Sequence, residues 1–429
     1  MSEHDSITAA TEARTATRLP RTARTTVWIL FAAWCIDYLD RQALAIALPF
    51  ITEDFALSAT AGGVLLSAFG IAYAVSQIPA GLLADRFGAK RLASFSLLAW
   101  SVFTALTALT WNFASIFVVR LLFGSAQAAY PNASMKAISE VTTRRQRMTA
   151  NGIVLSSNAV GIVVASLAVP LMISLVGWRW MFVASALLGV LLFALVAKWL
   201  PGPAKARAAR AEAGDPEEDP VADRRGSNTL LLSPWMWVYA GMHFGSGIIV
   251  YGLISWMPTY LVAARGVDLA GASILLAIPA VASAVGYVIS GRLSDRLGGR
   301  PRLVVAPIMV VCIVVLILMS NSANLMLFIL WETIAAFLVG LCTSSYFAVP
   351  LKSVRAAYAA TASSIVNTGA QVAGIVIPIV IGLIVDRSGF TLAFVALAAG
   401  AVIAAACALI APQTVDQFAG RLRDRSVIA

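Results

Sequence analysis

Predominantly apolar runs of about 20 residues recur along most of the chain, and this feature limits the possible folds more than any other. Inside a lipid bilayer the backbone must satisfy its own hydrogen bonds, so such runs indicate membrane-spanning α-helices. Twelve spans are predicted, at 27–49, 62–84, 92–111, 113–136, 148–176, 179–200, 234–261, 270–292, 302–320, 324–350, 360–385 and 390–411. The sequence therefore predicts an all-α membrane protein.

Composition supports this class and argues against others. Of the 429 residues 60% are hydrophobic and only 12% are charged, whereas soluble domains carry roughly 25% charged residues. The four cysteines lie inside apolar runs without a CxxC pair, and the chain has only two histidines. We therefore expect membrane-buried thiols, with no disulfide framework, no metal site and no cofactor.

The basic residues define a topology. If both termini are cytoplasmic, the cytoplasmic segments hold 26 of the 31 Lys and Arg residues, and the outside loops hold only Arg179, Arg265 and Arg387. Arg41 and Arg120 remain within the membrane. This bias is typical of multi-pass proteins of the cell (cytoplasmic or inner) membrane. The net charge of +10 is thus explained by topology, and binding of nucleic acid is not expected.

The longest polar stretch divides the spans into six plus six. Residues 201–233 are rich in Ala, Pro, Gly and charge and cannot bury a core. The predicted divisions are a cytoplasmic tail (1–26, which we expect to be retained and not cleaved as a signal peptide), a first half (27–200), a linker (201–233), a second half (234–411) and a cytoplasmic C-terminal tail (412–429).

An internal repeat supports two related halves. Gly81-Leu-Leu-Ala-Asp85-Arg86-Phe-Gly88 recurs as Gly291-Arg-Leu-Ser-Asp295-Arg296-Leu-Gly298, at an offset of 210 residues. Each copy ends the second span of its half. Two parallel halves related by an axis along the membrane normal are one of the known layouts of secondary transporters.

These residues also carry a family resemblance. The segment 81–91, GLLADRFGAKR, resembles the signature loop of the major facilitator superfamily, and 291–302 resembles its second copy. Over most of the chain the sequence resembles the anion:cation symporter branch, which includes sugar-acid permeases and vesicular glutamate transporters. The closer match lies in IDYLDRQALAIALPFI (36–51), LLSAFGIAYAVSQIPAGLLADRFG (65–88), RLLFGSAQAAYPN (120–132), GWRWMF (177–182), ISWMPTYL (254–261) and IVNTGAQVAGIVIPIVIGLIVD (365–386).

The resemblance implies a monomeric transporter that imports a small organic anion with protons, or with sodium, by rocker-type alternating access. A sugar acid, a dicarboxylate or an aromatic acid would each fit. Rival interpretations are a membrane enzyme, for which no catalytic motif is found, a transporter-like receptor, and a proton-coupled drug or metabolite efflux antiporter. The fifth span, 151–170, lacks the Gly-Pro-Gly signature of such exporters.

The repeated loop predicts a conformational latch. Asp85 lies at the inside end of the 62–84 span, near the start of the span at 360. A carboxylate against a helix N-terminus stabilises by roughly 0.3–1 kcal/mol when exposed. The latch would comprise Gly81, Asp85, Arg86, Gly88, Arg91, Asp295 and Arg296. The alternative is that these are ordinary topology charges.

Ionisable residues inside the predicted spans are the strongest functional signal, because each costs about 2.5–3.5 kcal/mol at a helix centre. Asp37 and Arg41 are spaced i, i+4 and can pair, with Asp40 beside them. The resemblance implies anion binding and proton coupling for this group, and makes Arg120 a substrate ligand. The alternatives are a self-neutralised brace and a structural tie to a neighbouring helix.

One position departs from the family. Many relatives carry a proton-coupling Glu where this chain has Gln127, and an amide carries no proton. Asp40, Asp37 and Glu332 are the acids that could replace it. If all three acids are ionised, they and the two arginines Arg41 and Arg120 have a summed charge of −1. An arriving substrate carboxylate adds a further negative charge, which makes protonation of one acid favourable. Anion and proton would then favour each other's binding. His243 is expected to be a packing residue.

Several polar side chains complete the predicted site. Tyr73, Gln127, Asn158, Tyr346, Asn367 and Gln371 would contact the rest of the substrate, several of them at family pocket positions. Such amides also tie membrane helices together, which is the alternative. Trp256-Met-Pro258 predicts a break or kink near the outer end of the seventh span, either a gate or an interfacial helix end.

Overall fold

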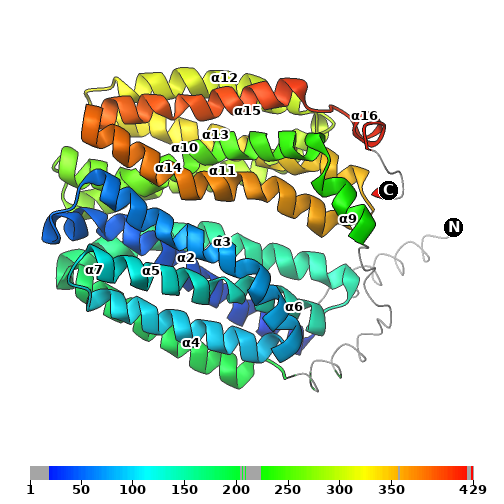
Figure 1. Cartoon of the computed structure of the whole chain (residues 1–429), viewed down its shortest axis with the longest axis horizontal. Helices are drawn as coiled ribbons and strands as arrows, with labels where there is room; N and C mark the ends of the chain where they lie inside the picture. The colour runs from blue at the N-terminus through cyan, green and yellow to red at the C-terminus, as the bar shows by residue number, and fades with distance from the viewer. Residues whose placement is uncertain are drawn as a thin grey trace, which may run out of the picture. The chain divides into compact units, whose positions relative to one another are not determined.

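The computed structural model describes residues 19–202, 205, 208, 224–355, 358–422 and 427–428. Within these ranges helices are joined by turns and short loops, and the β-structure is one isolated antiparallel bridge between Val354 and Ile428. The helices are labelled in Figure 1. In chain order they are α2 (Arg21–Asp54), α3 (Ala59–Phe87), α4 (Ala89–Ala108), α5 (Phe113–Gln127), α6 (Ala129–Val141), α7 (Arg144–Trp199), α9 (Arg224–Leu231), α10 (Pro234–Thr259), the π-helix η1 (Tyr260–Ala264), α11 (Leu269–Arg296), α12 (Pro301–Ser320), α13 (Leu325–Ser353), α14 (Ala359–Ala396), α15 (Ala398–Ile410) and α16 (Val415–Ala419).

The helices confirm the predicted fold class. Nine helical segments of the described chain are long and apolar enough to cross a membrane, and each predicted span falls on helix. Two of these segments, Thr149–Trp199 and Ala359–Ile410, have 51 and 52 residues and each covers two predicted spans. The first predicted span lies on α2, a helix of 34 residues.

Two glycines divide the double-length helices. Gly177 in α7 has φ 78°, and Gly389 in α14 has φ 77°. This left-handed backbone is accessible to glycine without a steric penalty, so it changes the helix direction where a loop was expected. The chain therefore kinks at these two points and passes from one predicted span to the next without a loop.

Other boundaries follow from capping side chains. Asn112 accepts a hydrogen bond from the Ser115 N–H at the start of α5, and Thr143 accepts one from the Gln146 N–H at the start of α7. Both form reciprocal capping boxes. Near Pro258 the expected break takes a particular form, because α10 ends at Thr259 and passes into the π-helix Tyr260–Ala264.

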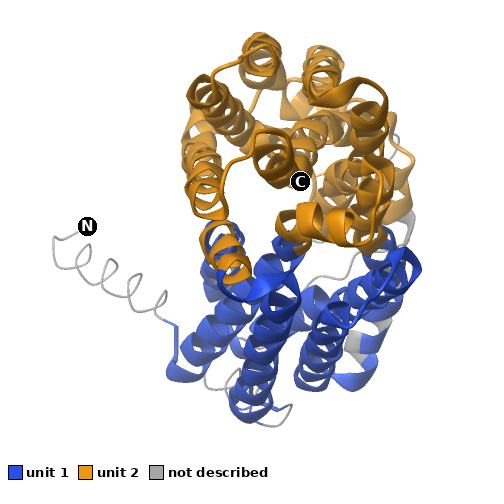
Figure 2. Cartoon of the chain, turned by 90° about the vertical axis from the view of Figure 1, so that its left-hand side faces the viewer, with its two compact units in different colours: residues 1–43, 71–165, 175–217 blue, residues 44–70, 166–174, 218–429 orange. Residues whose placement is uncertain are grey.

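The described chain forms two compact units (Figure 2). Unit 1 contains residues 1–43, 71–165 and 175–217, and unit 2 contains 44–70, 166–174 and 218–429. Unit 2 thus includes the C-terminal part of α2, the N-terminal part of α3 and a short piece of α7. The predicted halves, 27–200 and 234–411, stay a prediction from the sequence repeat.

Small residues allow close helix packing within unit 2. A Cβ on Gly286 of α11 would lie 2.6 Å from the Phe337 carbonyl oxygen of α13, and one on Gly245 of α10 would lie 2.4 Å from that of Gly400. Such backbone approach is typical of membrane helices, whose association gains little from burying apolar surface.

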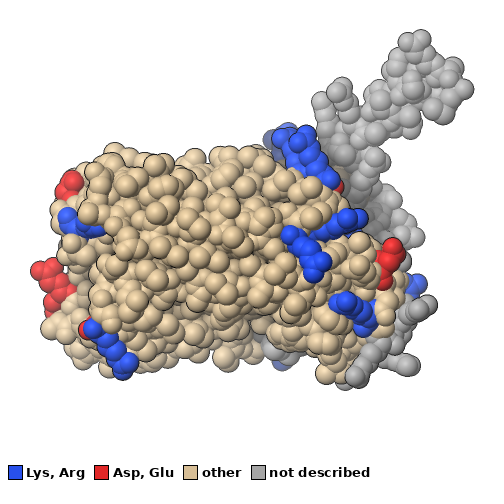
Figure 3. Space-filling model, turned by 90° about the horizontal axis from the view of Figure 1, so that it is seen from above, with Lys and Arg blue, Asp and Glu red and all other residues tan. Residues whose placement is uncertain are grey.

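The face of unit 2 that carries α12 and α15 is suited to lipid. Figure 3 shows it as a broad area without charged side chains, with Lys, Arg, Asp and Glu near the helix ends. The sequence of α15 contains no charged residue, and α12 contains only Arg302, at its start.

Candidate functional site

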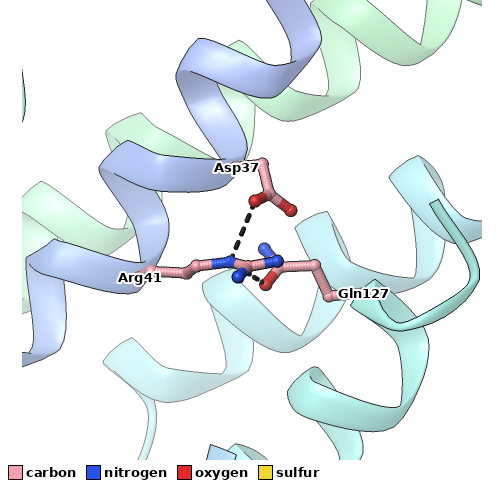
Figure 4. Close-up of polar contacts among 3 residues, drawn as sticks. All are labelled: Asp37, Arg41 and Gln127. Atoms are coloured by element: carbon pink, nitrogen blue, oxygen red, sulfur yellow. Dashed lines mark hydrogen bonds and ion pairs between the residues drawn. The ribbon is translucent and has the colours of Figure 1, made fainter. Parts of the chain in front are cut away.

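A charged group in unit 1 joins α2 to α5. Arg41 Nε lies 2.9 Å from Asp37 Oδ2, and its N–H donates to Gln127 Oε1 at 3.0 Å. Figure 4 shows the Arg41 guanidinium between the Asp37 carboxylate and the Gln127 amide. The i, i+4 spacing predicted the ion pair, whereas the bond to Gln127 connects residues 86 positions apart. Gln127 therefore holds the guanidinium of a residue on another helix.

Aromatic rings complete the surroundings of Arg41. Its guanidinium carbon lies 4.7 Å from the centre of the Tyr73 ring and 5.3 Å from that of Tyr38. Its side chain is 19% exposed, while that of Asp37 is fully buried. The arrangement orients a cation through a carboxylate, an amide and two π faces, and it leaves part of the Arg41 side chain exposed.

Arg120 and Asp40 belong to a second, more deeply buried group of the same unit. Arg120 is 1% exposed and donates from Nη2 to Thr107 Oγ1 at 2.6 Å. Its guanidinium carbon lies 4.6 Å from the Phe123 ring centre and 5.3 Å from that of Phe182. Asp40, also 1% exposed, interacts electrostatically with Arg120.

The two groups differ in access. Asp40 lies beside Thr104 and Trp100 of α4, and both of these side chains are buried. Each group contains one carboxylate and one guanidinium, so each can be neutral as it stands. Arg41 alone of the two arginines exposes part of its side chain, so it is the better placed to meet an anion in this structure.

The remaining predicted residues of the second half lie in unit 2. Glu332 of α13 is 4% exposed, and its Oε2 has no hydrogen-bond partner among the described residues. The Tyr346 hydroxyl hydrogen-bonds with the Ser246 hydroxyl, and the Tyr346 ring stacks on His243 at 5.2 Å. The His243 ring also contacts Phe347, which is consistent with packing.

Other predicted contact residues are more accessible. Asn158 and Asn367 are exposed, and Gln371 is half-buried. Each has the exposure that a ligand contact needs, but their roles stay predictions.

The predicted latch is described in part. The Asp85 side chain lies outside the described side chains. Arg86 lies over the Phe87 ring, at 5.5 Å, and Gly88 has φ 79° in the turn before α4. Asp295 pairs with Lys352 of α13 at 3.1 Å. The remaining basic residues of the motif, Arg91 and Arg296, are exposed. A latch role for these residues stays a prediction.

Several residues around the arginines were not anticipated. Thr107, Phe123 and Phe182 contact Arg120, and Tyr38 contacts Arg41. Buried hydroxyl groups in apolar spans were the available signal for Thr104 and Thr107. No comparable signal marks a phenylalanine in an apolar run.

No group of three or more His, Cys, Asp and Glu side chains within the described ranges could hold a metal ion. Long apolar helices that carry paired charges, Asp37 with Arg41 and Asp40 near Arg120, are typical of multi-pass membrane transporters. The chain belongs to the major facilitator superfamily, whose family model matches residues 30–378.

Relatives and a solved structure agree with this assignment. The chain is 28% identical to the hexuronate transporter of Bacillus subtilis over 90% of this chain and 93% of the relative. It is 29% identical to a probable sulfoacetate transporter of Cupriavidus necator, covering 84% and 87%. The crystal structure of a bacterial homologue of the human lysosomal transporter Spinster, inward-facing and unoccupied, matches with a TM-score of 0.80 at 18% identity, over 95% of this chain and 100% of that one.

Proposed function

We propose that the protein imports a small organic anion across the cell membrane by proton symport, with Arg41 as the principal anion ligand. The Arg41 guanidinium carries this proposal. It is oriented by Asp37 and Gln127, flanked by Tyr38 and Tyr73, and partly exposed. A planar guanidinium in such surroundings suits a carboxylate or a sulfonate, because it offers several donors in one plane.

The relatives narrow the substrate class. Their names include hexuronate, sulfoacetate and galactonate, which share an anionic head group on a small polar body. We infer a substrate of this kind. Hydroxyl groups on that body would be contacted by Asn158, Asn367 and Gln371, and the Tyr73 ring would pack against its carbon atoms.

Coupling to protons is inferred from the buried acids. Asp40 and Asp37 are each close to an arginine in a medium of low dielectric constant, where a second anion is costly. An arriving substrate carboxylate competes with Asp37 for Arg41. Protonation of one acid restores neutrality, so proton and anion bind together.

The remaining features of the proposal follow from the topology. Both termini are cytoplasmic, according to the distribution of basic residues. The protein acts as a monomer, and transport proceeds by rocking of the halves before and after the linker. With cytoplasmic termini, the N-terminus of α3 at Ala59 and the kink at Gly389 lie on the outer side of the membrane.

Uptake by purified protein in liposomes tests the function. Radiolabelled hexuronate, galactonate and sulfoacetate are supplied to the liposomes under an imposed inward pH gradient. Counterflow of the same acids is measured without a gradient. We expect accumulation above equilibrium for at least one acid, only with the gradient. Accumulation driven by sodium alone would contradict proton symport, and proton-driven expulsion would indicate the efflux antiporter.

A further inference from the structure

Two side chains cap the first turn of α3: Ser58, which directly precedes the helix, and Asp386, which is far away in the sequence. Ser58 Oγ accepts a hydrogen bond from the Ala61 N–H at 3.2 Å. The N–H groups of Ala59 and Thr60 donate to Asp386 Oδ1 and Oδ2 at 2.9 and 2.8 Å, and the Thr60 hydroxyl donates to Oδ2 at 2.5 Å. The first amides of a helix have no partner within it. Asp386, 326 residues from Thr60, therefore completes a cap that the N-terminal segment lacks.

Adjoining this cap, α3 and α14 are in direct backbone contact. A Cβ on Gly63 would lie 2.2 Å from the Pro378 carbonyl oxygen, and a Cβ on Gly382 would lie 2.5 Å from that of Ala59. Neither distance admits a methyl group. The Trp256 indole of α10 donates to the same Pro378 carbonyl at 3.1 Å, so three helices meet at this point.

The contact continues along one face of α3. Ser67 follows Gly63 by four residues and therefore shares its face, and it is fully buried. At Gly70 a Cβ would lie 3.0 Å from Ile375 Cγ1. We call this contact the outer seam, formed by Gly63, Ser67 and Gly70 of α3 and by Ile375, Pro378 and Gly382 of α14.

We propose that Asp386 is a gating residue, which latches the outer seam shut whenever the outer side of the transporter is closed. The proposal rests on the proposed function, because it takes this end of α3 as the outer end. A carboxylate on a helix N-terminus is favourable yet mostly solvent-exposed, so it can be broken once in each transport cycle. Glycines leave no interlocking side chains, so the two helices can separate without changing rotamers.

The latch has a predicted counterpart at the other end of the same two helices. Asp85, at the C-terminal end of α3, was predicted to approach the start of α14, while Asp386 of α14 caps the start of α3. Each helix would thus supply a carboxylate to the other. Alternating access requires one of these contacts to form as the other breaks.

Cysteine accessibility tests the latch. Cys35, Cys312, Cys342 and Cys407 are first replaced by serine, and Ser67→Cys is introduced as a reporter of similar size buried in the seam. Intact cells are treated with a membrane-impermeant methanethiosulfonate. We expect Asp386→Ala to raise the labelling rate about fivefold, the shift expected from loss of one helix cap. Asp268→Ala is the matched control, because Asp268 precedes α11 without a capping bond from its side chain.

The glycines give a second, stronger test. Gly63→Ala prevents close contact with Pro378, so we expect fast labelling at position 67, retained binding of an external substrate and loss of uptake. Gly62→Ala is the control on the same helix, because its Cβ would meet only side-chain atoms, at 3.4 Å. It should behave as the parent does.

The outcomes separate the latch from the substrate assignment, because labelling needs no substrate. Labelling within twofold of the parent in both Asp386→Ala and Gly63→Ala would overturn the latch. If Asp386→Ala does not fold, Thr60→Val, which removes one donor, decides in its place. Enhanced labelling together with no uptake of any acid by the parent would retain the latch and reject the proposed function.

Discussion

Arg41 and Arg120 have different surroundings, and we expect their alanine variants to fail differently. Arg41→Ala should abolish uptake with little change in melting temperature, because its side chain is partly exposed. Arg120→Ala should abolish uptake and also destabilise by roughly 3–5 kcal/mol, because it leaves Asp40 buried without its cation. Thermal shift and liposome uptake measure both effects. Near-normal transport by Arg41→Ala would contradict its role as ligand.

The buried acids carry the prediction for coupling. Asp40→Asn should abolish accumulation driven by a pH gradient while preserving substrate exchange, because the amide imitates a protonated acid that cannot release its proton. Asp37→Asn should weaken coupling more mildly, and Glu332→Gln tests the acid in unit 2. Counterflow beside gradient-driven uptake distinguishes the two activities. If all three variants still concentrate substrate, this proton pathway is wrong.

At the scale of the helices, the kinks in α7 and α14 depend on single glycines. Gly177→Ala places a side chain in a left-handed backbone, so we expect a loss of about 1–2 kcal/mol. Gly152→Ala is the matched change within α7, because nothing lies within 4 Å of its Cβ and its backbone is helical. That variant should be as stable as the parent or more so. Equal melting temperatures for the two variants would show that the kink does not need glycine.

For the whole molecule, we expect the linker to be dispensable as far as the start of helix α9. Residues 203–204, 206–207 and 209–223 lie outside the described residues, and their composition cannot form a core. The following helix α9 is different, because a Cβ on Gly226 would lie 2.5 Å from the Tyr358 ring and Leu230 is fully buried. Deletion of 209–223 should preserve uptake, whereas extending the deletion through α9 should lower stability. Loss of uptake in a correctly inserted 209–223 deletion would make the linker a gate.

Sequence alone determined the features that depend on local physics. The apolar runs predicted helices because lipid offers the backbone no other hydrogen-bond partners. The spacing of Asp37 and Arg41 predicted their ion pair because residues four apart share a helix face. The repeated loop and the quoted motifs predicted the family, which the match over residues 30–378 confirms.

Tertiary structure decided which faces of the helices meet. Hydropathy does not show how each helix is rotated about its own axis, because the surfaces facing lipid and those facing other helices are both apolar. The Arg41–Gln127 bond, the Phe182 ring beside Arg120 and the Asp386 cap on Thr60 all depend on it. Asp386 ended a motif quoted for the resemblance, yet its partner lies 326 residues away. Only packing, which brings glycine backbones into contact, places the two together.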